Sequence, residues 1–313
     1  MSVVAACSLI NGILMGADCR VTFRQPGRED ILVDNCQKLF TVGESSVVGF
    51  VGAVPLASSI LLSLCEQERR HRTDAVSLHN WFPRLCRFKY RAHADDNQRV
   101  TFLVGSTIPG HGNIVERQAV VDLANYMFFS PNRKAKTLFY DASIIALLNT
   151  PPHVKYIGIP VPRNLLYRLD SPDFMPRRLM PLRFVAVGSG ERLMEKIAGV
   201  REMIFAAFTG NYHMESFWFA NAMESYMQSV DEKTVGGLFP MAKLEYGRVM
   251  RLGQCSEGYF PGGYHIRLEP TDDGSWIQRN VVTGKEIPLV PPWEINPPAR
   301  NMTFDDFRYG MFG

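Results

Sequence analysis

Short apolar runs and polar turns alternate in the N-terminal part of the chain, and their spacing is typical of β-hairpins. Asn11-Gly12 lies between two apolar runs, and this dipeptide is a strong hairpin signal. A second pair of apolar runs is separated by a turn at Gly43 to Ser45. We therefore expect two successive hairpins, with strands at 2–10, 12–17, 31–43 and 46–52.

The apolar period lengthens after these strands. From Pro55, apolar residues recur at helical spacing, with the proline near the first turn and charges at the end. The apolar residues that set this spacing are Leu56, Ile60, Leu61 and Leu64. A second helix is expected at 74–91 and another strand at 99–106. Two hairpins followed by helices favour an antiparallel sheet with helices layered on it.

The rest of the sequence predicts that the chain is divided into two domains, 1–247 and 248–313. Within the first, the proline-rich stretch 107–181 is interpreted as an insertion. A strand at 182–187, a helix after Gly-Ser-Gly, a helix at 213–229 and a strand from Leu238 follow it. The second is interpreted as a small β appendage, with a turn at Thr283-Gly284 and a tail rich in proline and aromatic residues. We expect this tail to lie as an extended arm on its own domain or on a neighbour.

Composition and charge narrow the class of protein. The formal net charge of +3 and the absence of a dense Lys/Arg run argue against nucleic-acid binding. The six cysteines form no Cys-x-x-Cys pair, and the start lacks the features of a secretory signal. No apolar run is long enough for a membrane span, and no His/Cys spacing is typical of a metal site. We expect a cytoplasmic protein that binds no membrane, metal ion or cofactor.

Candidate chemistry begins at Ser2. If Met1 is removed, Ser2 carries both a hydroxyl nucleophile and an α-amino base, whose ordinary pKa is about 7.7–8.0. A buried Lys38 would lower the pKa of both groups, and Asp18 would pair with Lys38 and orient it. Two alternatives stay open: Asp18 pairs with the nearby Arg20, and Lys38 is a solvated strand residue.

Two further features extend the candidate site. Gly52 would offer its backbone N–H to an oxyanion, although it also suits a plain turn before a helix. Val21 and Thr22 would offer a free strand edge to an extended peptide, or are ordinary strand residues. Gly188-Ser189-Gly190 lacks the Lys of a phosphate-binding loop. From the residues alone, Ser189 suits a helix N-cap.

Four motifs in this order resemble one known family. They are Ser2-Val3-Val4, Ala17–Thr22, Gln37–Leu39 followed by Val48–Ala53, and Val187–Gly190. The family is that of the proteasome-type N-terminal-nucleophile hydrolases, which comprises proteasome β-subunits and bacterial proteasome-like peptidases. The steps from Ser2 to Asp18 and from Lys38 to Gly52 are similar to the family pattern. The chain departs from it with Ser instead of Thr as nucleophile, and with four extra residues between Asp18 and Lys38.

The resemblance implies an α+β fold with a four-layer αββα core. It implies peptide-bond cleavage inside a homo-oligomeric ring, on a peptide or an unfolded protein, with an ATP-dependent unfoldase as a conceivable partner. It assigns catalysis to Ser2, Asp18, Lys38, Ser189 and a late acidic residue, and substrate or oxyanion binding to Gly52, Arg20, Val21 and Thr22. The late acid is Asp231 by residue type, although Glu232 fits the distance to the following glycines better.

Two other functions compete with a peptidase. One is a catalytically silent structural subunit or scaffold, which a retained Met1 would favour and an intact set of Ser2, Asp18 and Lys38 would oppose. The other is an amidase that acts on a small amide. A closed pocket built by 107–181 would favour the amidase, whereas an open strand edge at Val21-Thr22 would count against it.

Overall fold

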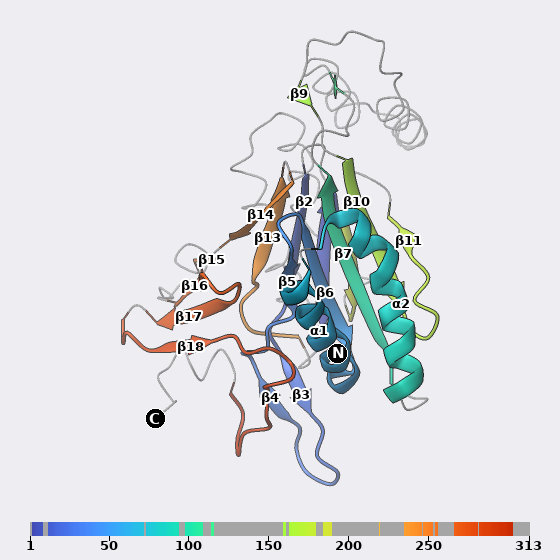
Figure 1. Cartoon of the computed structure of the whole chain (residues 1–313). Helices are drawn as coiled ribbons and strands as arrows, with labels where there is room; N and C mark the ends of the chain where they lie inside the picture. The colour runs from blue at the N-terminus through green and yellow to red at the C-terminus, as the bar shows by residue number, and fades with distance from the viewer. Residues whose placement is uncertain are drawn as a thin grey trace, which may run out of the picture.

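The computed structural model describes most of the chain between Ser2 and Met302 (Figure 1). The described residues are 2–8, 12–71, 73–93, 98–108, 114–115, 159–160, 163–179, 184–189, 219, 235–245, 247–252, 254–255, 266–280 and 282–302.

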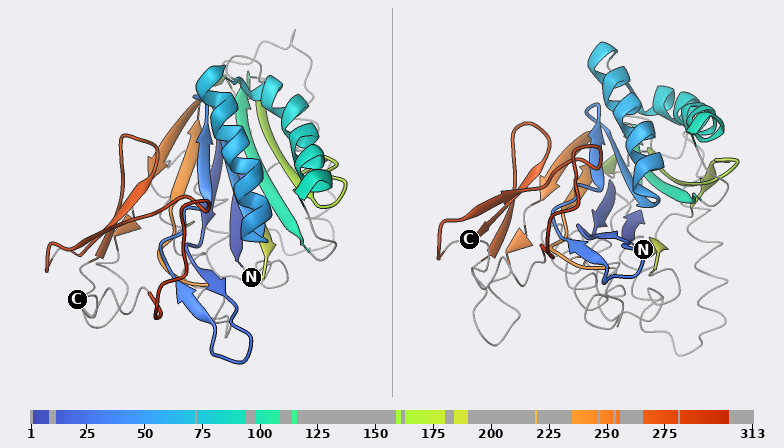
Figure 2. Two further views of the ribbon diagram at one scale, coloured as in Figure 1. Left: turned by 60° about the horizontal axis from the view of Figure 1, so that its bottom comes forward. Right: turned by 90° about the horizontal axis from the view of Figure 1, so that it is seen from below.

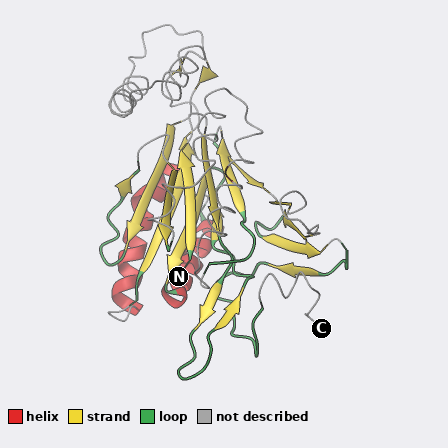
Figure 3. Cartoon of the chain, turned by 180° about the vertical axis from the view of Figure 1, so that it is seen from behind, coloured by secondary structure: helices red, strands yellow, loops and turns green. Residues whose placement is uncertain are grey.

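Two five-stranded antiparallel sheets face each other in the centre of the molecule (Figures 1 and 3). Sheet I contains, in spatial order, β12 (Phe184–Gly188), β1 (Val3–Ser8), β2 (Gly12–Ala17), β13 (Met241–Glu245) and β14 (Arg248–Leu252). Sheet II contains β11 (Arg177–Arg178), β10 (Arg163–Asp170), β7 (Val100–Ile108), β6 (Ser46–Gly52) and β5 (Leu39–Val42).

Three smaller sheets accompany this pair. The C-terminal sheet contains β15 (Gln254–Cys255), β16 (Ile266–Pro270), β17 (Trp276–Asn280) and β18 (Glu286–Pro288). The two-stranded sheets are β3 (Val21–Phe23) with β4 (Ile31–Val33), and β8 (Ile114–Val115) with β9 (Ile159–Pro160). The β3–β4 hairpin projects beyond the end of the sheets at which β1 begins (Figure 2).

The first predicted hairpin is confirmed, because β1 and β2 pair in antiparallel register from Val4 with Ala17 to Ser8 with Ile13. Alternate residues of β1 point into the space between the sheets, where Val4 packs in the same apolar cluster as Leu39. Gly49 of β6 has no side chain there, and a Cβ would lie 2.6 Å from the Val4 Cγ1 atom. The two sheets therefore approach closely next to the start of β1.

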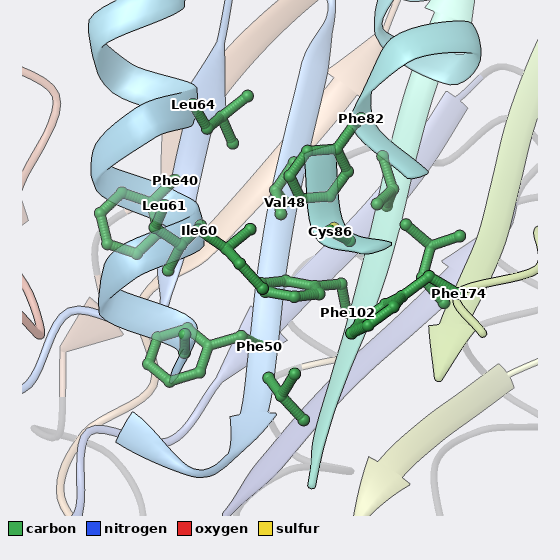
Figure 4. Close-up of a cluster of buried hydrophobic side chains, with 14 of the residues drawn as sticks. Phe40, Val48, Phe50, Ile60, Leu61, Leu64, Phe82, Cys86, Phe102 and Phe174 are labelled. Atoms are coloured by element: carbon green, nitrogen blue, oxygen red, sulfur yellow. The ribbon is translucent and has the colours of Figure 1, made fainter. Parts of the chain in front are cut away.

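Both predicted N-terminal helices are confirmed, as α1 (Val54–Arg70) and α2 (Ala75–His93). They cover the outer face of sheet II, and their apolar side chains pack against strand residues such as Phe50 and Phe102 (Figure 4). All four residues that set the helical spacing are buried: Leu56, Ile60, Leu61 and Leu64. The rings of Phe82 and Phe102 meet edge to face at 5.3 Å.

The predicted four-layer αββα core is wrong. The two helices of more than one described residue, α1 and α2, both lie on sheet II, and strands dominate the rest (Figure 3). In β17 the buried residues Trp276, Gln278 and Asn280 alternate with more exposed ones, which is the period of a strand. The C-terminal part therefore adds sheet to the fold. The helices expected after Gly190 and at 213–229 lie outside the described residues, apart from Phe219.

The strand predicted at 31–43 is also wrong, since it is divided into β4 and β5. Residues 34–37 leave the strand because their backbone N–H groups form hydrogen bonds with other parts of the chain. The Cys36 N–H donates to the Cys19 carbonyl at 3.0 Å, and the Gln37 N–H donates to the Val290 carbonyl at 2.8 Å. This break places Lys38 at the beginning of β5, opposite the start of β1.

The C-terminal segment lies against the N-terminal part of the same chain. Trp276 is fully buried in the cluster between the sheets. Parallel bridges join Val290 to Cys36 and Met302 to Val33. The division into domains at 247 stays a prediction, as does the insertion at 107–181. Within that insertion, β10 pairs with β7 over eight residues.

None of the helices in the described part of the chain is long and apolar enough to cross a membrane.

Candidate active site

Ser2 is held by the strands on both sides of β1. Its carbonyl accepts a hydrogen bond from the Ser189 N–H at 3.1 Å. The next residue, Val3, donates its N–H to the Asp18 Oδ1 at 2.8 Å, and its carbonyl accepts from the Asp18 N–H at 3.1 Å. Ser2 is 8% exposed. The position before β1 is therefore ordered, although chain ends usually fray.

The Lys38 ammonium joins three parts of the chain. Lys38 Nζ donates to the Ser2 Oγ at 2.8 Å, to the Asp18 Oδ1 at 2.9 Å, and to the Arg20 carbonyl. The ammonium has three N–H groups, so these contacts satisfy all of them. The Lys38 and Asp18 side chains are 1% and 0% exposed. The alternative of a solvated Lys38 is therefore wrong.

Burial dominates the titration of Asp18. Removal from water disfavours the carboxylate and raises the pKa of Asp18 above its ordinary value. The charge of Lys38 and the hydrogen bonds from Lys38, Val3 and Arg20 oppose this rise. A buried ion pair of this kind costs desolvation energy and is tolerated when its remaining hydrogen bonds are satisfied.

The alternative in which Asp18 pairs with the Arg20 side chain is also wrong. The Arg20 guanidinium binds Asp34, with Nε at 2.6 Å from Oδ1 and Nη2 at 2.7 Å from Oδ2. Only the backbone N–H of Arg20 reaches Asp18, at 3.2 Å from Oδ2. Arg20 thus contacts the Asp18–Lys38 pair through its main chain and Asp34 through its side chain.

Asp34 was missed as a site residue. A signal was present, because it is the one acidic residue in the otherwise apolar and neutral run Ile31 to Gln37. Its side chain is 2% exposed. Gly236 was also missed: a Cβ at this position would collide with the Arg20 guanidinium.

Gly52 ends β6 on the same side of the sheets. Its φ of +110° is a conformation that L side chains rarely adopt, and a Cβ would collide with the Arg99 carbonyl. Its neighbour Val51 is close to Gly188, where a Cβ would lie 3.3 Å from the Val51 Cγ1 atom. Gly188 in turn pairs with Val3. These contacts bring Gly52 near Ser2, and its role as oxyanion donor stays a prediction.

Gly188 and Ser189 lie beside Ser2, on the side of β1 that faces β12. Gly188 has a φ of +94°, and a Cβ there would collide with the Ser2 carbonyl oxygen. The Oγ of Ser189 is buried and has no hydrogen-bond partner within the described part of the chain. An unpartnered buried hydroxyl is costly in a folded protein. The Ser189 side chain therefore remains a candidate for contact with a reacting group.

Replacing Gly188 with alanine is expected to disturb the Ser2 position. The added Cβ must displace the Ser2 carbonyl, which breaks its hydrogen bond with Ser189, and the positive φ adds strain. We expect a loss of about 1–3 kcal/mol in the free energy of unfolding. Urea unfolding measures it.

The matched control is Gly284→Ala. Gly284 has a φ of +70°, and a Cβ there meets no atom within 4 Å. This control carries the backbone strain without the collision, so it should lose about 1 kcal/mol at most. An equal loss in both variants would show that Gly188 does not support Ser2 through close packing.

Val21 and Thr22 lie in β3. β3 pairs with β4, and no other described strand pairs with it. The Thr22 Oγ1 is buried without a hydrogen-bond partner among the described residues. The predicted strand edge is thus unoccupied by any described strand, and its role in substrate binding stays a prediction.

Asp231 and Glu232 lie outside the described residues, so the structure does not choose between them. In the described part of the chain, no group of three or more His, Cys, Asp or Glu side chains could hold a metal ion. Within the described part of the chain, Cys19, Cys36, Cys65 and Cys86 form no disulfide. Burial raises the pKa of the Cys36 thiol to about 12, which disfavours it as a nucleophile.

Comparisons with known proteins do not assign the chain to a family. No family model matches the sequence, and no curated protein matches it. The chain is similar to the solved structure of Anbu (ancestral beta-subunit) from Yersinia bercovieri, with 13% identity and a TM-score of 0.48 over 80% of this chain and 86% of that one. It is also similar to an Anbu (Gly-1) mutant from Hyphomicrobium sp. strain MC1, with 12% identity and a TM-score of 0.46 over 83% and 90%.

These findings correct the family predicted from the four motifs. Assignment to the proteasome β-subunits and bacterial proteasome-like peptidases is wrong, because neither a family model nor a curated protein supports it. The motifs are short runs of common residue types. Their order and spacing therefore matched the family pattern without identifying a member of it.

Proposed function

We propose that the chain is an N-terminal-nucleophile hydrolase that cleaves peptide bonds, with the hydroxyl of Ser2 as nucleophile after removal of Met1. One observation carries the proposal. The Lys38 ammonium is 2.8 Å from the Ser2 Oγ and is at the same time paired with the buried Asp18 carboxylate at 2.9 Å. A fully buried lysine requires an opposite charge and hydrogen-bond acceptors, and here one of these acceptors is the Ser2 hydroxyl.

The base in this mechanism is the α-amino group of Ser2. As the Oγ attacks the carbonyl carbon of an amide, its proton passes to this amine and the carbonyl oxygen becomes an oxyanion. The C–N bond then breaks, the leaving amine takes the proton, and Ser2 keeps the acyl group as an ester. Water hydrolyses the ester by the same steps. The positive charge of Lys38 favours the neutral amine and stabilises the developing alkoxide.

The surroundings of Ser2 suggest how a substrate is held. The N–H of Gly52 stabilises the oxyanion, and an extended peptide adds to the open edge of β3 at Val21 and Thr22. Arg20 directly precedes this edge and orients the first residue of the bound peptide. A homo-oligomeric ring and an ATP-dependent unfoldase remain predictions from the sequence, and native gel filtration tests the ring directly.

Intact mass before and after reaction with a peptide epoxyketone tests the proposed nucleophile. This reagent closes a ring with a hydroxyl and a free amine of one residue. We expect a mass that lacks one Met, followed by one adduct that peptide mapping assigns to Ser2. A mass that retains Met1, with no adduct, would overturn the proposal for that material and support the silent scaffold. Labelling without cleavage of any unfolded protein, but with hydrolysis of small amides, would support the amidase.

A further inference from the structure

Asp34 lies four residues before Lys38, and the side chain of Arg20 connects it to the site. Its carboxylate accepts two parallel hydrogen bonds from the Arg20 guanidinium, at 2.6 and 2.7 Å. Two-pronged pairing of this kind fixes the orientation of an arginine as well as its position. The third nitrogen of the guanidinium, Nη1, donates to the Val235 carbonyl at 3.2 Å. The Arg20 side chain is thus anchored at every nitrogen.

The main chain of Arg20 contacts both members of the catalytic ion pair. Its N–H donates to the Asp18 Oδ2 at 3.2 Å, and its carbonyl accepts from Lys38 Nζ. A rotation of the two peptide groups that flank Arg20 would remove one acceptor from the ammonium and one donor from the carboxylate. The anchoring of the Arg20 side chain by Asp34 therefore determines how Lys38 is presented to Ser2.

The C-terminal segment fixes the main chain of Asp34 itself. The Asp34 N–H donates to the Met302 carbonyl at 2.8 Å, and the Asp34 carbonyl accepts from the Gln278 Nε2 at 2.9 Å. Nearby, the Gln37 N–H donates to Val290 and the Val290 N–H donates to Asn35, both at 2.8 Å. Both peptide groups of Asp34 are therefore held by residues of the predicted appendage.

We propose that Asp34 is a positioning residue of the hydrolytic site, which acts through Arg20 on Lys38 and is held in place by Gln278 and the segment 289–302. This inference rests on the proposed function. It gives the C-terminal part of the chain a role in the chemistry at Ser2. The sequence had predicted no such role for that part.

Asp34 also neutralises a charge near the site. The charged groups described around the Ser2 amine are Asp18 after β2, Lys38 before β5, and Arg20 with its partner Asp34. The neighbouring residues of β12 and β6, Gly188 and Val51, carry no charge. Loss of the Asp34 carboxylate would remove one negative charge from beside the Arg20 guanidinium. An additional positive charge disfavours protonation of the amine, and so lowers its pKa.

The test measures the rate of epoxyketone adduct formation at Ser2 against pH. The acidic limb of this profile reports deprotonation of the Ser2 amine. In Asp34→Asn we expect the midpoint of that limb to move to lower pH by about half a unit or more. At the plateau we expect the rate per reactive site to fall by about 10- to 100-fold, because Lys38 is no longer held in one geometry.

The matched control is Asp170→Asn. Asp170 accepts two hydrogen bonds from the Arg168 Nε, at 2.7 and 2.8 Å, on β10 of sheet II. This variant also removes a carboxylate from an arginine pair, and we expect a wild-type pH profile. A purely structural role of Asp34 would lower only the fraction of reactive protein, which the adduct stoichiometry measures separately from the rate.

The double variant Arg20→Gln/Asp34→Asn removes both charges of the pair and is used if Asp34→Asn does not fold. We expect its acidic limb to return to the wild-type midpoint, with a plateau rate that stays low. A wild-type rate per reactive site in either variant would overturn the proposal for Asp34. Failure of the wild-type protein to form any adduct at Ser2 would instead overturn the proposed function.

Discussion

Ser2→Ala is expected to form no adduct with a peptide epoxyketone and to lose any amide hydrolysis by about 10³-fold or more. Alanine keeps the α-amino group and removes only the hydroxyl. Because alanine is as small as serine, Met1 should still be removed from this variant. The Lys38 ammonium loses one hydrogen-bond acceptor, at 2.8 Å in the wild-type protein, but keeps Asp18 and Arg20. The fold should therefore survive the substitution.

The matched control for Ser2→Ala is Ser8→Ala. Ser8 is 3% exposed and is the last residue of β1, which Ser2 precedes, so each substitution removes one buried hydroxyl at an end of this strand. Reaction with the epoxyketone should be unchanged in Ser8→Ala. Equal labelling of wild-type protein and Ser2→Ala, measured by intact mass, would remove Ser2 from the chemistry.

Lys38→Met is expected to abolish the reaction and also to destabilise the fold. Methionine has a similar length but no charge, so the Asp18 carboxylate stays buried without its partner. Breaking a buried ion pair in this way costs about 3–5 kcal/mol. Urea unfolding at constant pH measures this loss, and Asp18→Asn/Lys38→Met should recover part of it, since no buried charge then remains.

The destabilisation in Lys38→Met should depend on pH, with a sign that follows from Asp18. Burial already raises the pKa of Asp18 in the wild-type fold, and removal of Lys38 takes away the main opposing charge. A carboxyl with a raised pKa binds its proton more tightly in the folded state. Stability is therefore lost as the pH rises from the ordinary pKa through the folded one. An equal loss at pH 5 and pH 8 would contradict this account.

Local patterns predicted the elements that carry the candidate site. The Asn11-Gly12 signal predicted the pairing of β1 with β2, and the apolar spacing from Leu56 predicted α1. The spacing of Ser2, Asp18 and Lys38 predicted their proximity, and the structure brings these three side chains together. Their catalytic roles remain predictions.

Long-range contacts account for what the sequence could not predict. The break at 34–37 depends on backbone hydrogen bonds to Val290 and Met302, which leave no periodic signal in either segment. The partner of Arg20 likewise depended on this break, because only the loop path brings Asp34 to the guanidinium. The four-layer core was inferred from resemblance to a family, whereas the two long helices in the described part of the chain both lie on sheet II.

The hydrogen bond between Leu32 and Asn301 has a consequence for the timing of synthesis. The two residues are 269 positions apart, and the Asn301 side chain accepts from the Leu32 N–H at 2.9 Å. At about 5–20 residues per second, a ribosome needs roughly 13–54 seconds to add those 269 residues. Ser2 and Lys38 emerge early, whereas the strands that hold Asp34 emerge last. A nascent chain therefore carries Ser2 and Lys38 long before Gln278 and Met302, the residues that hold the main chain of Asp34, have been added.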